Sequence, residues 1–358
     1  MPTDAAIAVL DIETALPQRP IRLVLWAGMV ALAIAMLLSL GIGPTGASFA
    51  VFPRALGELG SATWSPETFV IWQIRLPRML LGLFVGVALA VSGAVMQGLF
   101  RNPLADPGLI GVSSGAALAA VATIALGNTI AAPITGVLGV YALPVAAFLG
   151  GFTATFALVT VCRRAGVVMI GTLLLAGIAV AALCGALTGF ITFASDDREL
   201  RDLTLWTLGS LAGASWPKVI AIAPFALFIA LLAPRVTRAL NGLLLGEAEA
   251  FHLGVDVEQA KRLCIVLGAA ATGAAVAVAG ILGFVGIIVP HLVRLVVGPD
   301  HRAVLPGVAI YGAVLVLLSD VIARMAVRPA ELPLGIVLAA VGAPVFLHLV
   351  VRRAAGEG

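Results

Sequence analysis

The chain has 358 residues, of which 61% are hydrophobic and 11% are charged, and its formal net charge is +3. Soluble domains carry about 25% charged residues, so this composition excludes a soluble globular protein and indicates an integral membrane protein. Basic residues in cytoplasmic loops explain the small positive charge, and we expect no nucleic-acid partner. The apolar runs are continuous rather than alternating, which favours transmembrane helices over a closed barrel.

A helix needs about 20 apolar residues to span a bilayer, and fewer where it is broken or tilted. The sequence predicts an N-terminal tail over residues 1–20, a single transmembrane domain over 21–353 and a C-terminal tail over 354–358. The fold class is therefore all-α and polytopic, with about ten helices. We expect them near residues 21–41, 77–99, 108–127, 141–161, 167–193, 216–233, 258–279, 285–297, 304–324 and 333–351.

The segment 75–111 has a rough second copy 187 positions later. Arg75 aligns with Arg262, and Gly93 aligns with Gly280. An odd number of crossings separates helix two from helix seven, so helices 2–5 and 7–10 are expected to form an inverted repeat. Such repeats are typical of transporters, although a duplication with a purely structural role is the alternative.

Two arginines stand at the start of the second expected helix. Pro77 suits the first helical turn, and this places Arg75 and Arg78 where the helix dipole disfavours cations. Either the two side chains snorkel to lipid headgroups, or they receive acidic residues of a docking protein. Later in the chain, Asp196 and Glu199 have the spacing of a capping box, which predicts a short helix that continues to residue 211.

Residues 234–260 form the one long polar insertion, and the excess of Lys and Arg on the same side places both chain termini in the cytoplasm. Gly246 and Gly254 are expected to separate two short helices at the membrane surface. An ordinary solvated loop is the alternative, but apolar residues on a short helix indicate a face for a partner protein. Those residues are Ala248, Ala250, Phe251 and Leu253.

The expected spans hold few ionisable residues. Asp320 lies four positions before Arg324, which predicts a local ion pair. The chain lacks the GxxxxGK[ST] loop that binds nucleotide phosphates, and its three cysteines have no metal-ligand spacing. We therefore expect no catalytic residue and no metal site, and uphill transport would draw its energy from another polypeptide. A membrane-embedded enzyme would need a cluster of polar residues, and a passive channel would need no energy source.

Six segments of the chain resemble one protein family. They are RLPR, SGAVMQGLFRNPLADPGLIGVSSGAALAA, LWTLGSLAGASWP, LGEAEAFHLGVDV, GFVGIIVPHLVR and ELPLGIVLAAVGAPVFLHLV. They are similar to the permease subunit of ATP-binding-cassette importers for ferric siderophores, haem and cobalamin. The resemblance implies a homodimeric permease of the bacterial inner membrane that works with two ATPase subunits and a periplasmic binding protein. ATP and Mg would bind to the ATPase, and this chain would carry no cofactor.

The resemblance also implies roles for individual residues. Arg75, Arg78 and Arg324 match the arginines that receive acidic residues of the binding protein. The segment that would couple the permease to the ATPase includes Gly246, Glu247, Ala248, Ala250, Leu253 and Gly254. The candidates for an inner gate are Arg163, Arg164, Ala165 and Gly166, and those for the pathway, on the helix 167–193, are Thr172, Leu175 and Thr188.

The transported substrate is predicted from the segments SDDRELRDLTLWTLGSL and NPLADPGLIGVSSGAA, which look most like the haem importers. Haem is therefore expected as the cargo, and a ferric siderophore and cobalamin are the alternatives. No His or Tyr falls within the expected pathway as an axial iron ligand, which suits passage of haem without coordination.

Overall fold

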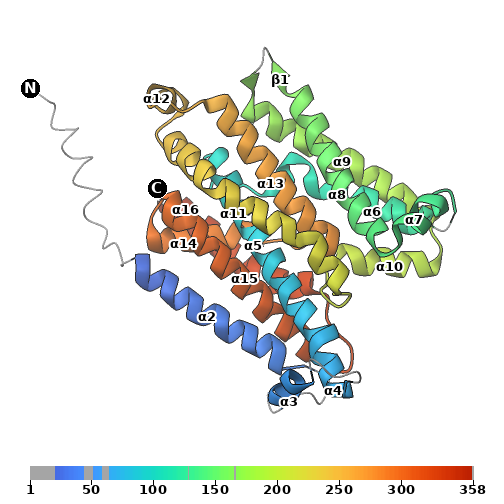
Figure 1. The fold of residues 1–358 in the computed structure, drawn as a ribbon. Coiled ribbons are helices and arrows are strands. Elements are labelled where there is room, and N and C mark those ends of the chain that lie inside the picture. Colours follow the sequence, from blue (N-terminus) through green and yellow to red (C-terminus); the bar gives the residue numbers. More distant parts are fainter. Residues whose placement is uncertain (1–20, 44–50, 59–63, 128, 165–166, 357–358) are drawn as a thin grey trace, which may run out of the picture.

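Helices make up almost all of the chain that the structure, a computed structural model, describes, namely residues 21–43, 51–58, 64–127, 129–164 and 167–356. Each of the ten helices expected from the sequence is present (Figure 1). Seven are long and apolar enough to cross a membrane, and three are shorter apolar helices. The ten are α2 (Ile21–Gly41), α5 (Leu76–Leu99), α6 (Val112–Leu126), α8 (Ala142–Val161), α9 (Ile170–Ala194), α11 (Trp216–Leu244), α13 (Val257–Ala279), α14 (Val285–Val297), α15 (His301–Met325) and α16 (Leu334–Gly356).

Short elements connect these helices. They are α3 (Phe52–Gly57), α4 (Pro66–Phe69), the π-helical turn η2 (Val70–Arg75), the 3-10 turns η3 (Pro107–Ile110) and η4 (Gly139–Tyr141), α7 (Ala132–Leu138), α10 (Asp197–Thr207), α12 (Glu247–His252) and the strands β1 (Arg163–Arg164) and β2 (Val167–Val168). The two strands pair antiparallel in a minimal hairpin. We call the end of the bundle with α12 and β1 the α12 end, and the opposite end, with α3, α4 and α10, the α4 end (Figure 1).

The centre of the bundle is built from α5 and α13, which are buried over most of their length, whereas α2 and α9 expose most of theirs. These central helices begin the two copies of the expected repeat. They run in opposite directions, because α5 starts at the α4 end and α13 starts at the α12 end (Figure 1). The Ser92 hydroxyl of α5 donates to the carbonyl oxygen of Gly268 at 2.9 Å and lies 2.7 Å from the Thr272 hydroxyl, so a polar contact joins the two copies.

Glycines let α5 approach its other neighbours backbone to backbone. A methyl group on Gly93 would overlap the carbonyl oxygen of Gly286 in α14, and one on Gly86 would lie 2.5 Å from the carbonyl oxygen of Gly312 in α15. In lipid the helices gain little from hydrophobic attraction, so close packing of this kind supplies much of their association. Gly86 and Gly93 therefore act at helix crossings, as packing residues.

Two helix ends differ from the sequence prediction. Helix α11 does not stop at residue 233 but continues to Leu244 through Pro234, because Val236, Leu240 and Leu243 bury one face of the extension. The expected insertion is therefore helical in its first part. The C-terminal tail expected from residue 354 also begins as helix, since α16 reaches Gly356, whereas residues 1–20 lie outside the described part of the chain.

Two short helices also differ in extent. The capping box of Asp196 and Glu199 is confirmed, but α10 ends at Thr207, four residues early, ahead of a turn in which Gly209 has a φ of +68°. In the insertion, Gly246 and Gly254 do not separate two short helices. They flank one helix, α12, and both have positive φ angles. These glycines set α12 at an angle to the long helices on either side of it.

Candidate functional site

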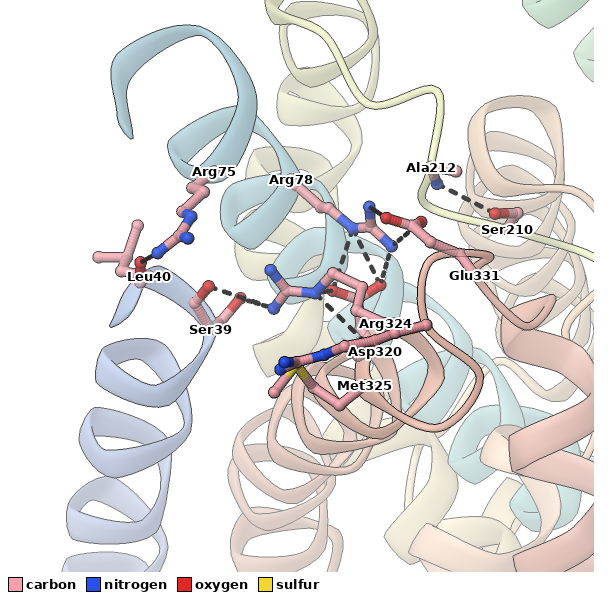
Figure 2. A network of polar contacts seen from close by, with 11 residues as sticks. Ser39, Leu40, Arg75, Arg78, Ser210, Ala212, Asp320, Arg324, Met325 and Glu331 are labelled. Atoms are coloured by element: carbon pink, nitrogen blue, oxygen red, sulfur yellow. Dashed lines mark hydrogen bonds and ion pairs between the residues drawn. The ribbon is translucent and has the colours of Figure 1, made fainter. Parts of the chain in front are cut away.

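Three arginines predicted as a docking site lie at the α4 end and are buried there (Figure 2). Arg75 closes the turn η2, Arg78 stands in the first turn of α5, and Arg324 stands in the last turn of α15. The Arg75 guanidinium donates to the carbonyl oxygen of Leu40 at 2.6 Å, which ties η2 to the end of α2. None of the three side chains presents an open basic surface.

Asp320 of α15 lies between Arg78 and Arg324 (Figure 2). Its carboxylate accepts from Nη2 and Nε of Arg78 at 2.9 and 3.1 Å, and it pairs with Nε of Arg324 at 3.1 Å. The predicted pair of Asp320 with Arg324 is therefore confirmed. The partner from α5 was missed, because 242 positions separate it from Asp320.

Glu331, in the loop before α16, is the second carboxylate at this site. It pairs with Nη2 of Arg78 at 2.9 Å, and its side chain is 29% exposed, whereas that of Asp320 is 1% exposed. Arg324 also donates to the carbonyl oxygen of Ser39 at 3.2 Å. We call this group, composed of Ser39, Arg78, Asp320, Arg324 and Glu331, the arginine network. It joins α2, α5, α15 and the start of α16.

The arginine network is balanced in charge, with two guanidinium groups against two carboxylates. Buried ions are tolerated in this form because each charge has a partner and its hydrogen bonds are made. The docking role inferred from the family resemblance stays a prediction. In this structure the three arginines bind carboxylates and carbonyl oxygens of the same chain.

A carboxylate outside the bundle also lies at the α4 end. Glu58, just after α3, accepts from the backbone N–H and the hydroxyl of Ser65, both at 2.9 Å, and from Arg54 at 2.9 Å. These hydrogen bonds, with that of the Ser65 backbone foremost, hold the pKa of Glu58 at about 2. Glu58 thus stays ionised and fastens α3 to the N-cap of α4.

At the opposite end of the molecule, α12 carries the residues predicted to couple to an ATPase. Ala250 is fully buried against the bundle, and Gly246 is also buried. Phe251 and Leu253 are 68% and 65% exposed. Glu247, Ala248 and Gly254 are exposed as well. One side of α12 is therefore seated on the bundle, and the other presents apolar side chains.

The predicted inner gate coincides with the hairpin of β1 and β2. Arg163 and Arg164 form β1, whereas Ala165 and Gly166 lie outside the described residues. Val168 of β2 is buried, and its backbone N–H donates to Oε2 of Glu258 at 3.0 Å. The hairpin is thus tied to the start of α13.

Lys261, in the second turn of α13, is a buried cation whose role the sequence did not reveal. Its Nζ pairs with Glu247 of α12 at 2.8 Å and with Glu258 at 3.0 Å, and its side chain is 3% exposed. The spacing of Glu258 and Lys261 is the only local sign of these pairs in the sequence. The contact to α12 depends on how the chain turns at Gly254.

The predicted pathway residues lie on α9, which, like α2, exposes most of its length. Thr172 and Leu175 are exposed, and Thr188 is partly buried. The buried residues of α9 are Leu173, Gly177 and Cys184, which lie on one stripe of the helix. Most of the remaining α9 surface is uncovered in the described chain.

A cavity of about 600 Å³ in the described part of the chain lies between α2, α14, α15 and α16, and its almost wholly apolar lining offers no polar ligand site. In the same described part of the chain, no three His, Cys, Asp or Glu residues are grouped as metal ligands would be.

Comparison with known proteins assigns the family. The model of the FecCD transport family matches residues 31–352. The chain belongs to this family. This FecCD permease is 44% identical to the hemin transport system permease protein HmuU of Yersinia pestis, over 93% of this chain and 96% of that one. It is 41% identical to the cobalamin import system permease protein BtuC of Halobacterium salinarum, over 97% of this chain and 94% of that one.

A further relative is the vitamin B12 import system permease protein BtuC of Salmonella paratyphi A, which is 40% identical over 94% of this chain and 97% of that one. Among solved structures, a metal-chelate type ABC transporter in an inward-facing conformation matches with a TM-score of 0.79 and 34% identity, over 92% of this chain and 98% of that one. This FecCD permease is therefore the membrane subunit of an ABC importer. It is not itself an enzyme, since ATP hydrolysis belongs to a separate subunit of such transporters.

Proposed function

We propose that this permease moves haem across the bacterial inner membrane, from a periplasmic binding protein to the cytoplasm. The observation that carries the proposal is the 44% identity to the hemin permease of Yersinia pestis along nearly the whole of both chains. The cobalamin permeases follow at 41% and 40%, and the matching solved structure is of a metal-chelate transporter. Cobalamin and a ferric siderophore are therefore the second candidates.

Uptake into liposomes tests the substrate. The complex of permease, ATPase and binding protein is reconstituted with ATP on the ATPase side, and haem, a ferric siderophore and cobalamin are offered separately. The proposal requires uptake of haem that stops when ATP is omitted. Uptake of cobalamin or the siderophore with none of haem would overturn the choice of substrate, and haem entry without ATP would point to a passive channel.

We infer that two copies of the chain form the pathway between them. The long uncovered surface of α9 supports a partner of the same kind, and Thr172, Leu175 and Thr188 would then face the pathway or the second copy. Light scattering of the purified complex should give two permeases and two ATPases. A complex with one permease would contradict this arrangement.

We infer that the ATPase binds α12 and that the α12 end faces the cytoplasm. Phe251 and Leu253 are exposed and offer apolar contacts to a partner. The helix α12 itself packs against the bundle through the buried Ala250. Leu253→Glu places a charge in this interface, so the ATPase should no longer co-purify with the permease. The matched control is Leu56→Glu, since Leu56 of α3 is 57% exposed but lies at the α4 end. Equal co-purification of both variants would argue against the site.

We infer that a periplasmic binding protein docks at the α4 end, where its carboxylates would have to displace the groups of the chain that now bind Arg75, Arg78 and Arg324. Because the last two hold the arginine network together, Arg75→Gln is the variant that tests docking with least damage to the fold. It should weaken the affinity of the binding protein for the permease. Arg54→Gln is the control, since Arg54 is exposed at the same end and pairs with Glu58, four positions away. Unchanged affinity in the Arg75 variant would remove that residue from the site.

A further inference from the structure

We propose that Lys261 is a positioning residue that transmits a displacement of α12 to the hairpin of β1 and β2. The inference rests on the proposed function, in which the ATPase acts on α12. Figure 1 shows α12, the start of α13 and β1 at the same end of the bundle. Lys261 provides a continuous polar connection between these three elements.

The connection begins at α12 and ends at β2. Oε2 of Glu247, the first residue of α12, lies 2.8 Å from Nζ of Lys261, and Oε1 of Glu258 lies 3.0 Å from the same Nζ. The other oxygen of Glu258 accepts from the backbone N–H of Val168 at 3.0 Å. A single carboxylate therefore bridges the lysine and the hairpin through charge-assisted hydrogen bonds, which are the stronger kind.

Burial makes this connection stiffer than a surface ion pair. An exposed pair at the spacing of Glu258 and Lys261 contributes little, because solvent screens it. The Lys261 side chain is 3% exposed, whereas those of Glu247 and Glu258 are 52% and 25% exposed, so the burial lies on the lysine side of each pair. A buried ammonium group without a partner is costly. If α12 moved away alone, Glu247 would leave that ammonium half-paired. Movement of α12 together with Lys261 and Glu258 keeps the pairs intact.

From the hairpin the displacement can reach α9. Val168 is buried and lies two residues before Ile170, the first residue of α9, whose next buried residue is Leu173. In the register of the hairpin, Val168 stands opposite Arg163 of β1. A shift of Glu258 therefore acts on both strands of the hairpin, of which β1 holds Arg163 and Arg164 of the predicted gate, and on the predicted pathway helix.

The alternative is that the ion pairs of Lys261 only stabilise this end of the bundle. A purely stabilising residue would change the stability of the complex but not the amount of cargo moved for each ATP hydrolysed. A transmitting residue would change that ratio in a complex that is still assembled. The ratio of transport to hydrolysis therefore distinguishes the two roles.

The test uses the full complex in liposomes and measures ATP hydrolysis and cargo uptake together. Lys261→Met keeps the length and apolar stem of the side chain and leaves the exposed residues of α12 untouched, so the ATPase should stay bound. We expect hydrolysis within about twofold of the wild type and at least a tenfold fall in cargo moved per ATP. Arg238→Met, which removes an exposed positive charge from α11, is the control and should retain the wild-type ratio.

Two more variants complete the experiment: a conservative one at Lys261, and one that interrupts the connection at Glu258. Lys261→Arg should restore the ratio, because it keeps the charge and because a cavity of about 380 Å³, lined by Lys261 and Glu247, has room for the larger group. Glu258→Gln leaves one acceptor oxygen where Lys261 and Val168 each have one in the wild type, so the connection to the hairpin or to the lysine is broken. It keeps the pair of Lys261 with Glu247 and should also lower the ratio, even if the Lys261 variant does not assemble. An unchanged ratio in an assembled Lys261→Met or Glu258→Gln complex would overturn the inference. Failure of the wild-type chain to bind an ATPase would instead refute the proposed function.

Discussion

Replacing Asp320 with Asn should destabilise the permease more than any other conservative change in the arginine network. Asp320 is fully buried and neutralises Arg78 and Arg324 together. An Asn side chain keeps one acceptor oxygen but turns an amide N–H toward the second guanidinium. One positive charge is then left uncompensated in the bundle. Removal of one partner from a buried pair costs about 3–5 kcal/mol, and we expect a loss of that size.

The loss can be measured as the free energy of unfolding in detergent micelles with increasing amounts of SDS. Glu331→Gln is the matched comparison, because it removes the same charge from a carboxylate that is 29% exposed. For that variant we expect about 1 kcal/mol or less. The double variant Asp320→Asn with Arg324→Met removes the unpaired cation, so it should be more stable than Asp320→Asn alone.

Two results would refute this reasoning. A loss below about 1 kcal/mol for Asp320→Asn would mean that lipid headgroups or water reach the network and satisfy the arginines. A double variant less stable than the single one would mean that Arg324 stabilises the bundle through its packing and its bond to Ser39, and that the charge balance matters little.

Two further predictions concern other contacts. Gly93→Ala should destabilise the bundle by about 1–3 kcal/mol, because the new methyl group collides with Gly286, whereas Gly189→Ala in α9 meets no neighbour and should be tolerated; equal stabilities would contradict this. The lowered pKa of Glu58 means that its stabilisation is present above about pH 4.5 and is lost as the pH falls through about 2. Ser65→Ala removes the hydroxyl donor but keeps the backbone N–H, so it should raise that pKa only part of the way toward 4.5 in carboxyl NMR titrations, and an unchanged value would contradict the assignment.

The sequence predicted the helices well because the solvent dictates them. A chain in lipid must satisfy every backbone group within each span, so long apolar runs become helices almost without exception. The ends of the helices were harder to predict, because a helix can continue beyond the apolar run that marks its span. Pro234 marked the expected end of the sixth helix, yet α11 continues because its extension has its own buried face.

The candidate sites were predictable only in their local parts. Asp320 and Arg324 are one helical turn apart, so their pair could be read from spacing. The partnership of Arg78 with Asp320 and that of Lys261 with Glu247 depend on which helices become neighbours. A single sequence gives no direct sign of such contacts, and it suggested exposure for arginines that the fold buries.

The glycine crossings of α5 restrict how the bundle can change shape. A shift of α5 by one turn would bring Leu89 or Gln97 into the place of Gly93, against the backbone of Gly286. The second crossing, of Gly86 with Gly312 of α15, obstructs sliding in the same way. We therefore expect α5, α14 and α15 to move as one rigid body. When the transporter changes between its inward-open and outward-open states, the helices around this body would be the ones that rearrange.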